Sequence, residues 1–158
     1  MCLKFHNFQS TCHHMKPETI FQICNSIAPI GWILMIVAPR WIVTKKMILS
    51  GLMPLLLAVV YLALIVIFFG DSEGNFSSLQ GVAKLFEDPF ALTAGWIHYL
   101  AFDMFIGAWE VNDSQKHGIS HFLVIPCLII TFLFGPIGLL FYFTIRSIKT
   151  KKIFHEPA

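Results

Sequence analysis

Long apolar stretches alternate with short polar segments along this chain. The four longest run from about Ile20 to Ala38, Met47 to Phe69, Phe90 to Ala108 and Ile119 to Ile145. A helix that crosses the hydrocarbon core of a bilayer needs roughly 20 mostly apolar residues, and these stretches meet that requirement. The pattern therefore predicts an all-α integral membrane protein, a bundle of four transmembrane helices.

A weaker helical pattern lies between the second and third stretches. Ser77 or Ser78 can cap the start of a helix, and Pro89 can stop it. Between them, apolar side chains recur at helical spacing, at Leu79, Val82, Ala83 and Phe86. We predict a short amphipathic helix at the membrane interface. A surface helix packed on the bundle and a lid over a site both remain open interpretations.

Composition agrees with a membrane protein and bounds its domains. The 158 residues are 56% hydrophobic and 13% charged, which is outside the usual range of soluble domains. We predict one transmembrane domain over residues 19–148, a disordered tail over 1–18 and a basic tail over 149–158. A polar tract precedes the first stretch and no small-residue cleavage site follows it, so we expect a retained helix rather than a signal peptide.

The cysteine and histidine positions do not predict a metal site. Cys2, Cys12, His13 and His14 match no zinc-binding spacing, and no second ligand pair follows them. Each of the other cysteines lies alone in an apolar stretch and is expected to be a small core residue, namely Cys24 and Cys127. Neither a metal nor a cofactor is therefore predicted.

The basic residues give a prediction of orientation. With four spans, the termini and the loop over 70–89 share one side of the membrane with seven Lys and Arg residues: Lys4, Lys16, Lys84, Arg146, Lys149, Lys151 and Lys152. The other side holds four, namely Arg40, Lys45, Lys46 and Lys116. This favours cytoplasmic termini, although three of the four lie in one short loop. The flanking charges explain the net charge of +2, so membrane lipids rather than nucleic acid are the expected partners, and no oligomeric state is predicted.

The third apolar stretch is unusual because it carries acidic residues. In the run GWIHYLAFDMFIGAWEVND, residues 95–113, helical spacing aligns Trp96, Tyr99, Asp103 and Glu110 on one face. An Asp at the centre of a span raises the free energy of insertion by about 2.5 to 3.5 kcal/mol. We therefore expect Asp103 to face the bundle interior and to find a partner there. His98, which need not share that face, and His121 are expected to face the interior as well.

Polar residues also gather where the third and fourth stretches meet. Glu110 and Asp113 are expected to end the third helix at the interface, followed by His117 and, one turn into the fourth span, His121. The first loop opens on the same side, so we predict that Arg40 lies at this end. Asp103 lies about 10 Å deeper than Glu110 at 1.5 Å per residue, so a polar funnel leads from the loops to the buried acid.

Four segments resemble membrane proteins of the abscisic acid-deficient-four type. They are APRW at 38–41, LQGVAKLFEDPFAL at 79–92, GWIHYLAFDMFIGAW at 95–109 and GISHFLVIPCLIITFLFGPIGLLFYF at 118–143. The resemblance covers most of the chain after about Pro29, and the run from Gly95 to Asp103 is specific rather than compositional. In plants, members are associated with neoxanthin synthesis, in which one epoxide of violaxanthin opens to an allene without net redox change. The resemblance implies a carotenoid-related membrane enzyme, and it does not fix the substrate.

Such a reaction needs an acid for the departing oxygen and a base for a proton on the polyene. We predict Asp103 as the acid and His98 or His121 as the base. Substrate-binding residues are expected beside them, at Tyr99, Trp96, Arg40 and Glu110. In the structural alternative, Asp103 only joins helices through hydrogen bonds to Tyr99, Thr131 or Arg40.

The fourth stretch contains helix-breaking residues. Pro126 and the segment FGPIG at 134–138 interrupt the predicted helix, which would give either a groove for a flat polyene or a close helix contact. Three classes of function stay open. A carotenoid or isoprenoid-lipid isomerase leads, a non-catalytic scaffold or lipid-binding membrane protein is the main alternative, and a haem protein with His98 and His121 as axial ligands is third.

Overall fold

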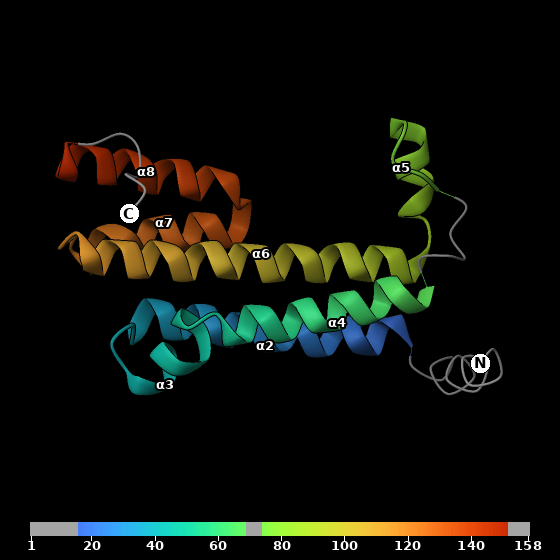
Figure 1. Cartoon of the computed structure of the whole chain (residues 1–158), viewed down its shortest axis with the longest axis horizontal. Coiled ribbons are helices and arrows are strands. Elements are labelled where there is room, and N and C mark those ends of the chain that lie inside the picture. The colour runs from blue at the N-terminus through green and yellow to red at the C-terminus, as the bar shows by residue number, and fades with distance from the viewer. Residues whose placement is uncertain (1–15, 69–73, 152–158) are drawn as a thin grey trace. The chain divides into compact units, whose positions relative to one another are not determined.

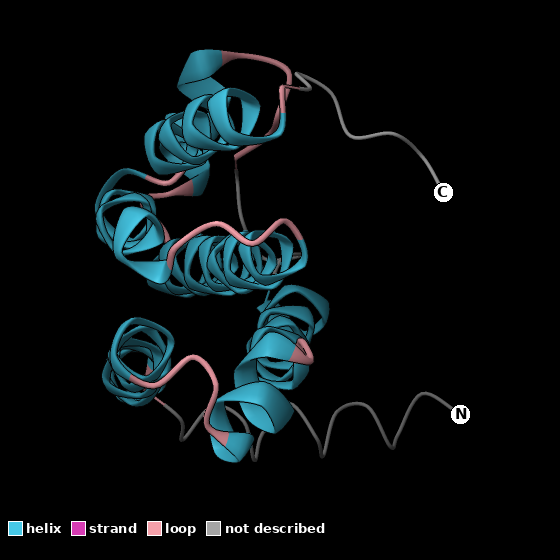
Figure 2. Cartoon of the chain, turned by 90° about the vertical axis from the view of Figure 1, so that its left-hand side faces the viewer, coloured by secondary structure: helices cyan, strands magenta, loops and turns pink. Residues whose placement is uncertain are grey.

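The computed structural model describes residues 16–68 and 74–151, and no strand is present in these ranges (Figure 2). Three helical segments are long and apolar enough to cross a membrane: Pro17–Val37, Ile42–Phe68 and Pro89–Lys116. The prediction of an all-α chain with membrane-spanning helices is confirmed at this level. The number of candidate spans in the described residues is three, where four were predicted.

The first two apolar stretches form helices close to the predicted limits. Helix α2 covers Pro17–Val37, and Cys24 is buried in it as expected. The second segment is built from a short turn of helix, a wider π-helical turn and a long helix, α3 (Ile42–Thr44), η1 (Lys45–Leu49) and α4 (Leu52–Phe68). Asn112 donates a 2.9 Å hydrogen bond to the carbonyl oxygen of Leu49, which satisfies one of the carbonyls at the end of η1.

The short helix after the second stretch is present as α5, Leu79–Leu85. The Ser78 hydroxyl accepts a 3.0 Å hydrogen bond from the Gly81 amide, so the predicted cap is confirmed. Leu79 is 86% exposed, and the buried residues of α5 are Gly81 and Leu85. The position of this helix at a membrane interface stays a prediction. Asn75 folds back onto the helix, where its backbone amide donates to the Gly81 carbonyl at 3.1 Å. That contact buries the Gly81 side of α5.

The third stretch forms one long helix, α6, over Pro89–Lys116. It begins where Asp88 Oδ1 accepts a 2.8 Å hydrogen bond from the Ala91 amide, and it continues about two turns beyond the predicted end at Ala108. Glu110 and Asp113 therefore lie inside the helix, 0% and 3% exposed, and the prediction that they end it at the interface is wrong. Charged residues did not stop the helix because tertiary partners bury them.

The fourth stretch is not a single span. It forms two helices, α7 (His121–Phe134) and α8 (Pro136–Thr150), which pack against each other and run in opposite directions (Figure 1). Gly135 makes the reversal, with φ of +50°, and Pro136 opens α8, where its fixed φ is favourable. A side chain at Gly138 would collide with Thr131, so the missing Cβ lets the two helices meet. At 1.5 Å per residue each helix is about 21 to 23 Å long, shorter than a hydrocarbon core of about 30 Å.

The chain divides into two compact units. The first unit comprises Met1–Ile27 and Leu56–Leu100, and the second comprises Ala28–Leu55 and Ala101–Ala158. Within the second unit α2 and α6 approach closely at Gly107, where an added Cβ would lie 2.7 Å from the Trp32 ring. The predicted tails fall largely on residues outside the described ranges, although α2 already begins at Pro17 and α8 continues to Thr150.

Candidate functional site

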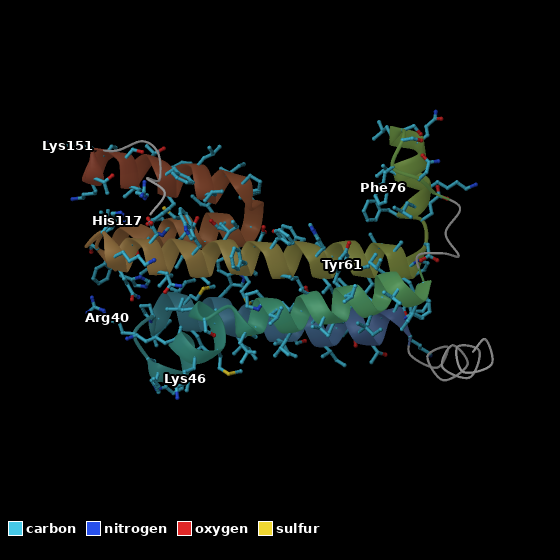
Figure 3. All side chains as sticks on the ribbon, in the orientation of Figure 1. Arg40, Lys46, Tyr61, Phe76, His117 and Lys151 are labelled. Atoms are coloured by element: carbon cyan, nitrogen blue, oxygen red, sulfur yellow. The ribbon has the colours of Figure 1, made fainter. Side chains whose placement is uncertain are left out.

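In the first unit, His98 lines an apolar pocket of about 440 Å³. Helix α6 presents His98 beside Tyr61 of α4, with 5.5 Å between the two ring centroids. Aliphatic and aromatic side chains from α4, α5 and the segment before α5 form the other walls, including Ile65, Phe76, Leu85 and Phe86 (Figure 3 labels Tyr61 and Phe76). His98 is exposed, so the prediction that it faces the bundle interior is wrong.

The two aromatic residues predicted to bind substrate lie elsewhere in this unit. Trp96 donates a 3.0 Å hydrogen bond from Nε1 to Asn25 Oδ1 of α2, and its ring packs against Phe21 at 5.8 Å between centroids. Tyr99 stacks beside Trp96 at 5.4 Å. Trp96 borders a small pocket with Pro17 and Phe21, separate from the residues that surround His98. These rings hold α6 against α2.

In the second unit, the Asp103 carboxyl group lies against the turn between α7 and α8. A Cβ placed on Gly135 would be 3.1 Å from Asp103 Oδ1 and 3.3 Å from Oδ2. Gly135 is the residue that precedes the first turn of α8, where the helix dipole carries partial positive charge. Asp103 is half-buried and is placed to interact favourably with that helix end. Thr131, one of its predicted partners, instead binds Glu110.

Glu110 lies two turns further along α6 and is completely buried. The Thr131 hydroxyl of α7 donates a 3.0 Å hydrogen bond to Glu110 Oε1. The other carboxyl oxygen, Oε2, is buried and forms no hydrogen bond with any residue in the described ranges. Burial of a carboxyl group away from water has a large free-energy cost. The hydrogen bond from Thr131 offsets part of that cost, so the packing of α7 on α6 stabilises the buried Glu110.

A buried charged network, which sequence reasoning missed, joins α6 to α8. Asp113 Oδ2 accepts hydrogen bonds from the Tyr142 hydroxyl at 2.6 Å and from Arg146 Nε at 2.8 Å. Asp113 and Arg146 are each 3% exposed. His117 adds a contact from the end of α6, with Nδ1 3.4 Å from Asp113 Oδ1. The four-residue spacing of Tyr142 and Arg146, which places both on one face of a helix, was the available signal.

The remaining predicted residues meet in a second pocket, of about 640 Å³, at one end of the second unit. Arg40 and Trp41 line it from the segment after α2, Ser114 and Gln115 from α6, and His121 from α7. His121 Nε2 lies 2.9 Å from the carbonyl oxygen of Ile36. Because a carbonyl can only accept, Nε2 carries a proton and caps the end of α2. The prediction that Arg40 lies at the α6–α7 end is confirmed.

The predicted acid, Asp103, and the predicted bases, His98 and His121, therefore lie in three different environments. Asp103 and His98 are five residues apart on α6, which is about 140° around a helix. Asp103 meets the α7–α8 turn, His98 meets α4, and His121 lies in the Arg40 pocket. No pocket described here combines the Asp103 carboxyl group with either imidazole in the described ranges.

Comparison with known proteins adds the decisive observation. A family model described as ABA DEFICIENT 4-like matches residues 19–142. The chain belongs to this family. It is 30% identical over 146 residues to the protein ABA DEFICIENT 4, chloroplastic, of Arabidopsis thaliana, an alignment that covers 82% of this chain. The chain spans 64% of the length of that relative. No solved structure matches.

The region shared with the ABA DEFICIENT 4-like family contains every residue predicted to act or to bind. It extends from the beginning of α2 into α8 and includes both pockets and the Gly135 turn. Within the missed network, Asp113 and Tyr142 fall inside the matched range, whereas Arg146 lies four positions beyond it. The family assignment thus covers the candidate residues of each unit.

Proposed function

We propose that this protein is a multi-pass membrane isomerase that acts on an epoxy-carotenoid or a related isoprenoid. Its family membership and its relative named ABA DEFICIENT 4 support a role in this area of chemistry. The observation that carries the proposal is the apolar pocket of the first unit, which contains one imidazole, from His98, and one phenol, from Tyr61. A hydrophobic cavity with few polar groups suits one end of an isoprenoid that carries a single oxygen function.

The dimensions and the walls of the pocket support this ligand class. Its volume of about 440 Å³ lies in the usual range for small-molecule sites, about 300 to 1,000 Å³. Phe76, Leu85 and Phe86 give it flat and aliphatic surfaces from the α5 region. The only titratable groups among its lining residues are His98 and Tyr61. Any acid–base chemistry in this pocket therefore falls to these two side chains.

The reaction can be balanced with this pair. The His98 imidazole removes a proton from the polyene carbon next to the epoxide, the released electrons form the allene, and the epoxide C–O bond breaks. The Tyr61 hydroxyl donates its proton to the departing oxygen, which becomes an alcohol. Proton return from the His98 imidazolium to the Tyr61 phenolate restores both groups, so no electrons or atoms are gained or lost. Tyrosine and histidine both serve as general acids and bases in enzymes.

The competing assignment uses Asp103 as the acid and His121 as the base. The Asp103 carboxyl group adjoins the start of α8, where a negative charge can also have a purely structural role. The His121 imidazole caps the end of α2. Trp96, Tyr99, Arg40 and Glu110 stay candidate substrate contacts in this version. The two assignments make opposite predictions for the same set of conservative variants.

The experiment measures conversion of an epoxy-carotenoid to its allenic product, normalised to folded protein in the membrane. His98→Gln and Tyr61→Phe are expected to lower the rate by about 10² to 10⁴, because each removes one proton-transfer group. The control is His117→Gln, which removes an imidazole outside the pocket and is expected to keep the wild-type rate. Normal conversion in both pocket variants, with loss in Asp103→Asn and His121→Gln, would contradict the roles of His98 and Tyr61 and support Asp103 as the acid and His121 as the base.

A non-catalytic membrane protein is the second candidate. The observation that favours it is the use of acids in helix packing, where Glu110 binds Thr131 and Asp113 binds Tyr142 and Arg146. Wild-type protein that is folded in the membrane but gives no conversion of epoxy-carotenoids would support this candidate against the isomerase.

A further inference from the structure

The pocket beside Arg40 has a composition unlike that of the His98 pocket. It lies where α2 ends, where α6 ends and where α7 begins, and its lining includes a guanidinium group, an imidazole, two serine hydroxyls and a primary amide. Arg40, Lys46 and His117, all of the second unit, are labelled in Figure 3. Since α2 and α6 are candidate spans, their shared end corresponds to the membrane surface, where lipid headgroups lie.

The charged residues around the pocket favour an anion as its ligand. Its lining residues contain no Asp or Glu, and Arg40 forms no ion pair with any residue between 16–68 or 74–151. Asp113, which directly precedes the lining residue Ser114, is bound by Tyr142 and Arg146 on another side of α6. Arg40 is therefore an unneutralised cation at the rim of a cavity, and guanidinium groups bind phosphate oxygens in a two-pronged geometry.

Two further features add positive potential on the same side. The imidazole of His121 donates through Nε2 to the Ile36 carbonyl and so covers a carbonyl at the negative end of α2. The N-terminus of α7 also opens here, and the hydroxyl of its N-cap residue, Ser120, does not cap it. Trp41 and Phe122 complete the pocket with rings suited to the region between headgroups and acyl chains.

We propose that this pocket binds the phosphate group of an anionic membrane lipid, with Arg40 as the principal ligand. The volume of about 640 Å³ is larger than a phosphate ion requires, and the rings beside the polar groups fit the glycerol and the first carbons of the lipid tails. The site is independent of the proposed isomerase reaction, since none of its lining residues lines the His98 pocket.

The test uses the full chain in a neutral detergent, with dihexanoyl phosphatidic acid as the probe. Binding is measured from the dependence of Tm on lipid concentration and by native mass spectrometry. Arg40→Gln is expected to weaken the apparent affinity about tenfold to a hundredfold, the range for loss of charged hydrogen bonds. The matched control is Lys46→Gln, which removes the same charge from η1, outside the pocket, and is expected to change affinity less than about threefold.

Two comparison ligands separate the sources of the phosphate chemistry. Dihexanoylglycerol has the same tails without phosphate and is expected not to bind at the concentrations that saturate phosphatidic acid. Inorganic phosphate is expected to bind much more weakly. Equal affinity for inorganic phosphate would overturn the assignment to a lipid. Equal losses in Arg40→Gln and Lys46→Gln would show general attraction to a basic surface and would overturn the pocket itself.

Discussion

Replacement of Arg146 by Met tests the buried network between α6 and α8. In the protein, Arg146 Nε lies 2.8 Å from Asp113 Oδ2 and the Tyr142 hydroxyl lies 2.6 Å from the same oxygen. Both charged side chains are 3% exposed, so water cannot replace the lost partner. Met has a similar length and no charge. The variant therefore leaves the Asp113 carboxylate in place with Tyr142 as its remaining strong donor.

The size of the effect follows from this burial. Removal of one member of a buried ion pair typically lowers the free energy of unfolding by about 3 to 5 kcal/mol. Loss of Tyr142 alone, in Tyr142→Phe, removes one hydrogen bond to a charged group and should lower it by about 1.5 to 3 kcal/mol. In Asp113→Asn/Arg146→Met no isolated charge is left, so the double variant should be more stable than the sum of the single variants predicts, by about 1 to 3 kcal/mol.

The assay is reversible unfolding of the purified protein in mixed micelles, followed by far-ultraviolet circular dichroism, with hydrogen exchange to locate the loss in α8. Lys149→Met is the matched control, because it removes an exposed cation from the same helix and should change stability by no more than about 0.5 kcal/mol. Equal stability of Arg146→Met and Lys149→Met would refute the reasoning. Purely additive effects in the double variant would refute the ion pair as its cause.

Three further outcomes are expected. Gly135→Ala should lower the free energy of unfolding by about 1 to 3 kcal/mol, because φ is +50° and the new Cβ would lie 3.1 Å from Asp103 Oδ1; Gly118→Ala, which has open space around its Cβ, should lose only the backbone part in the same unfolding assay. Thr131→Val should lower it by about 1 to 3 kcal/mol by leaving Glu110 without its donor, and Thr131→Ser should restore most of the loss. Reporters fused to the two ends of the chain should appear on opposite sides of the membrane, since three spans and a returning helix pair reverse the parity of four spans; reporters on the same side would contradict this topology.

Hydrophobicity predicted the long helices because each apolar stretch contains about as many residues as a membrane-spanning helix needs. It failed at the fourth stretch, where the run from Ile119 to Ile145 is mostly apolar but the backbone reverses at Gly135. The summed hydrophobicity of the side chains contains no information on the backbone dihedral angle φ. The two glycines at 135 and 138 and Pro136 marked an interruption, but whether the halves stay in line or fold back depends on the contact of Gly138 with Thr131. That contact is tertiary.

The candidate site shows the same limit for charged residues. Arg146 and Lys149 both follow an apolar stretch, and both were expected to be flanking charges at the membrane surface. Arg146 is buried because Asp113, 33 positions earlier, lies opposite it, whereas Lys149 is exposed. His98 was predicted as a candidate base from its place in an apolar helix, but its neighbour Tyr61 comes from a separate helix with no local pattern to indicate it. Spacing predicts faces of one helix and does not predict which helix covers them.

The packing of the α7–α8 helix pair on α6 also has a consequence for the order of events during synthesis. Glu110 leaves the ribosome 21 residues before Thr131, and Asp113 leaves it 33 residues before Arg146. At about 5 to 20 residues per second, the longer delay is about 2 to 7 s. During that interval α6 enters the bilayer with acids whose later neighbours do not yet exist. A nascent chain interrupted before α7 therefore keeps two carboxyl groups without their partners in a membrane segment, whereas one interrupted between α7 and α8 lacks only the partners of Asp113.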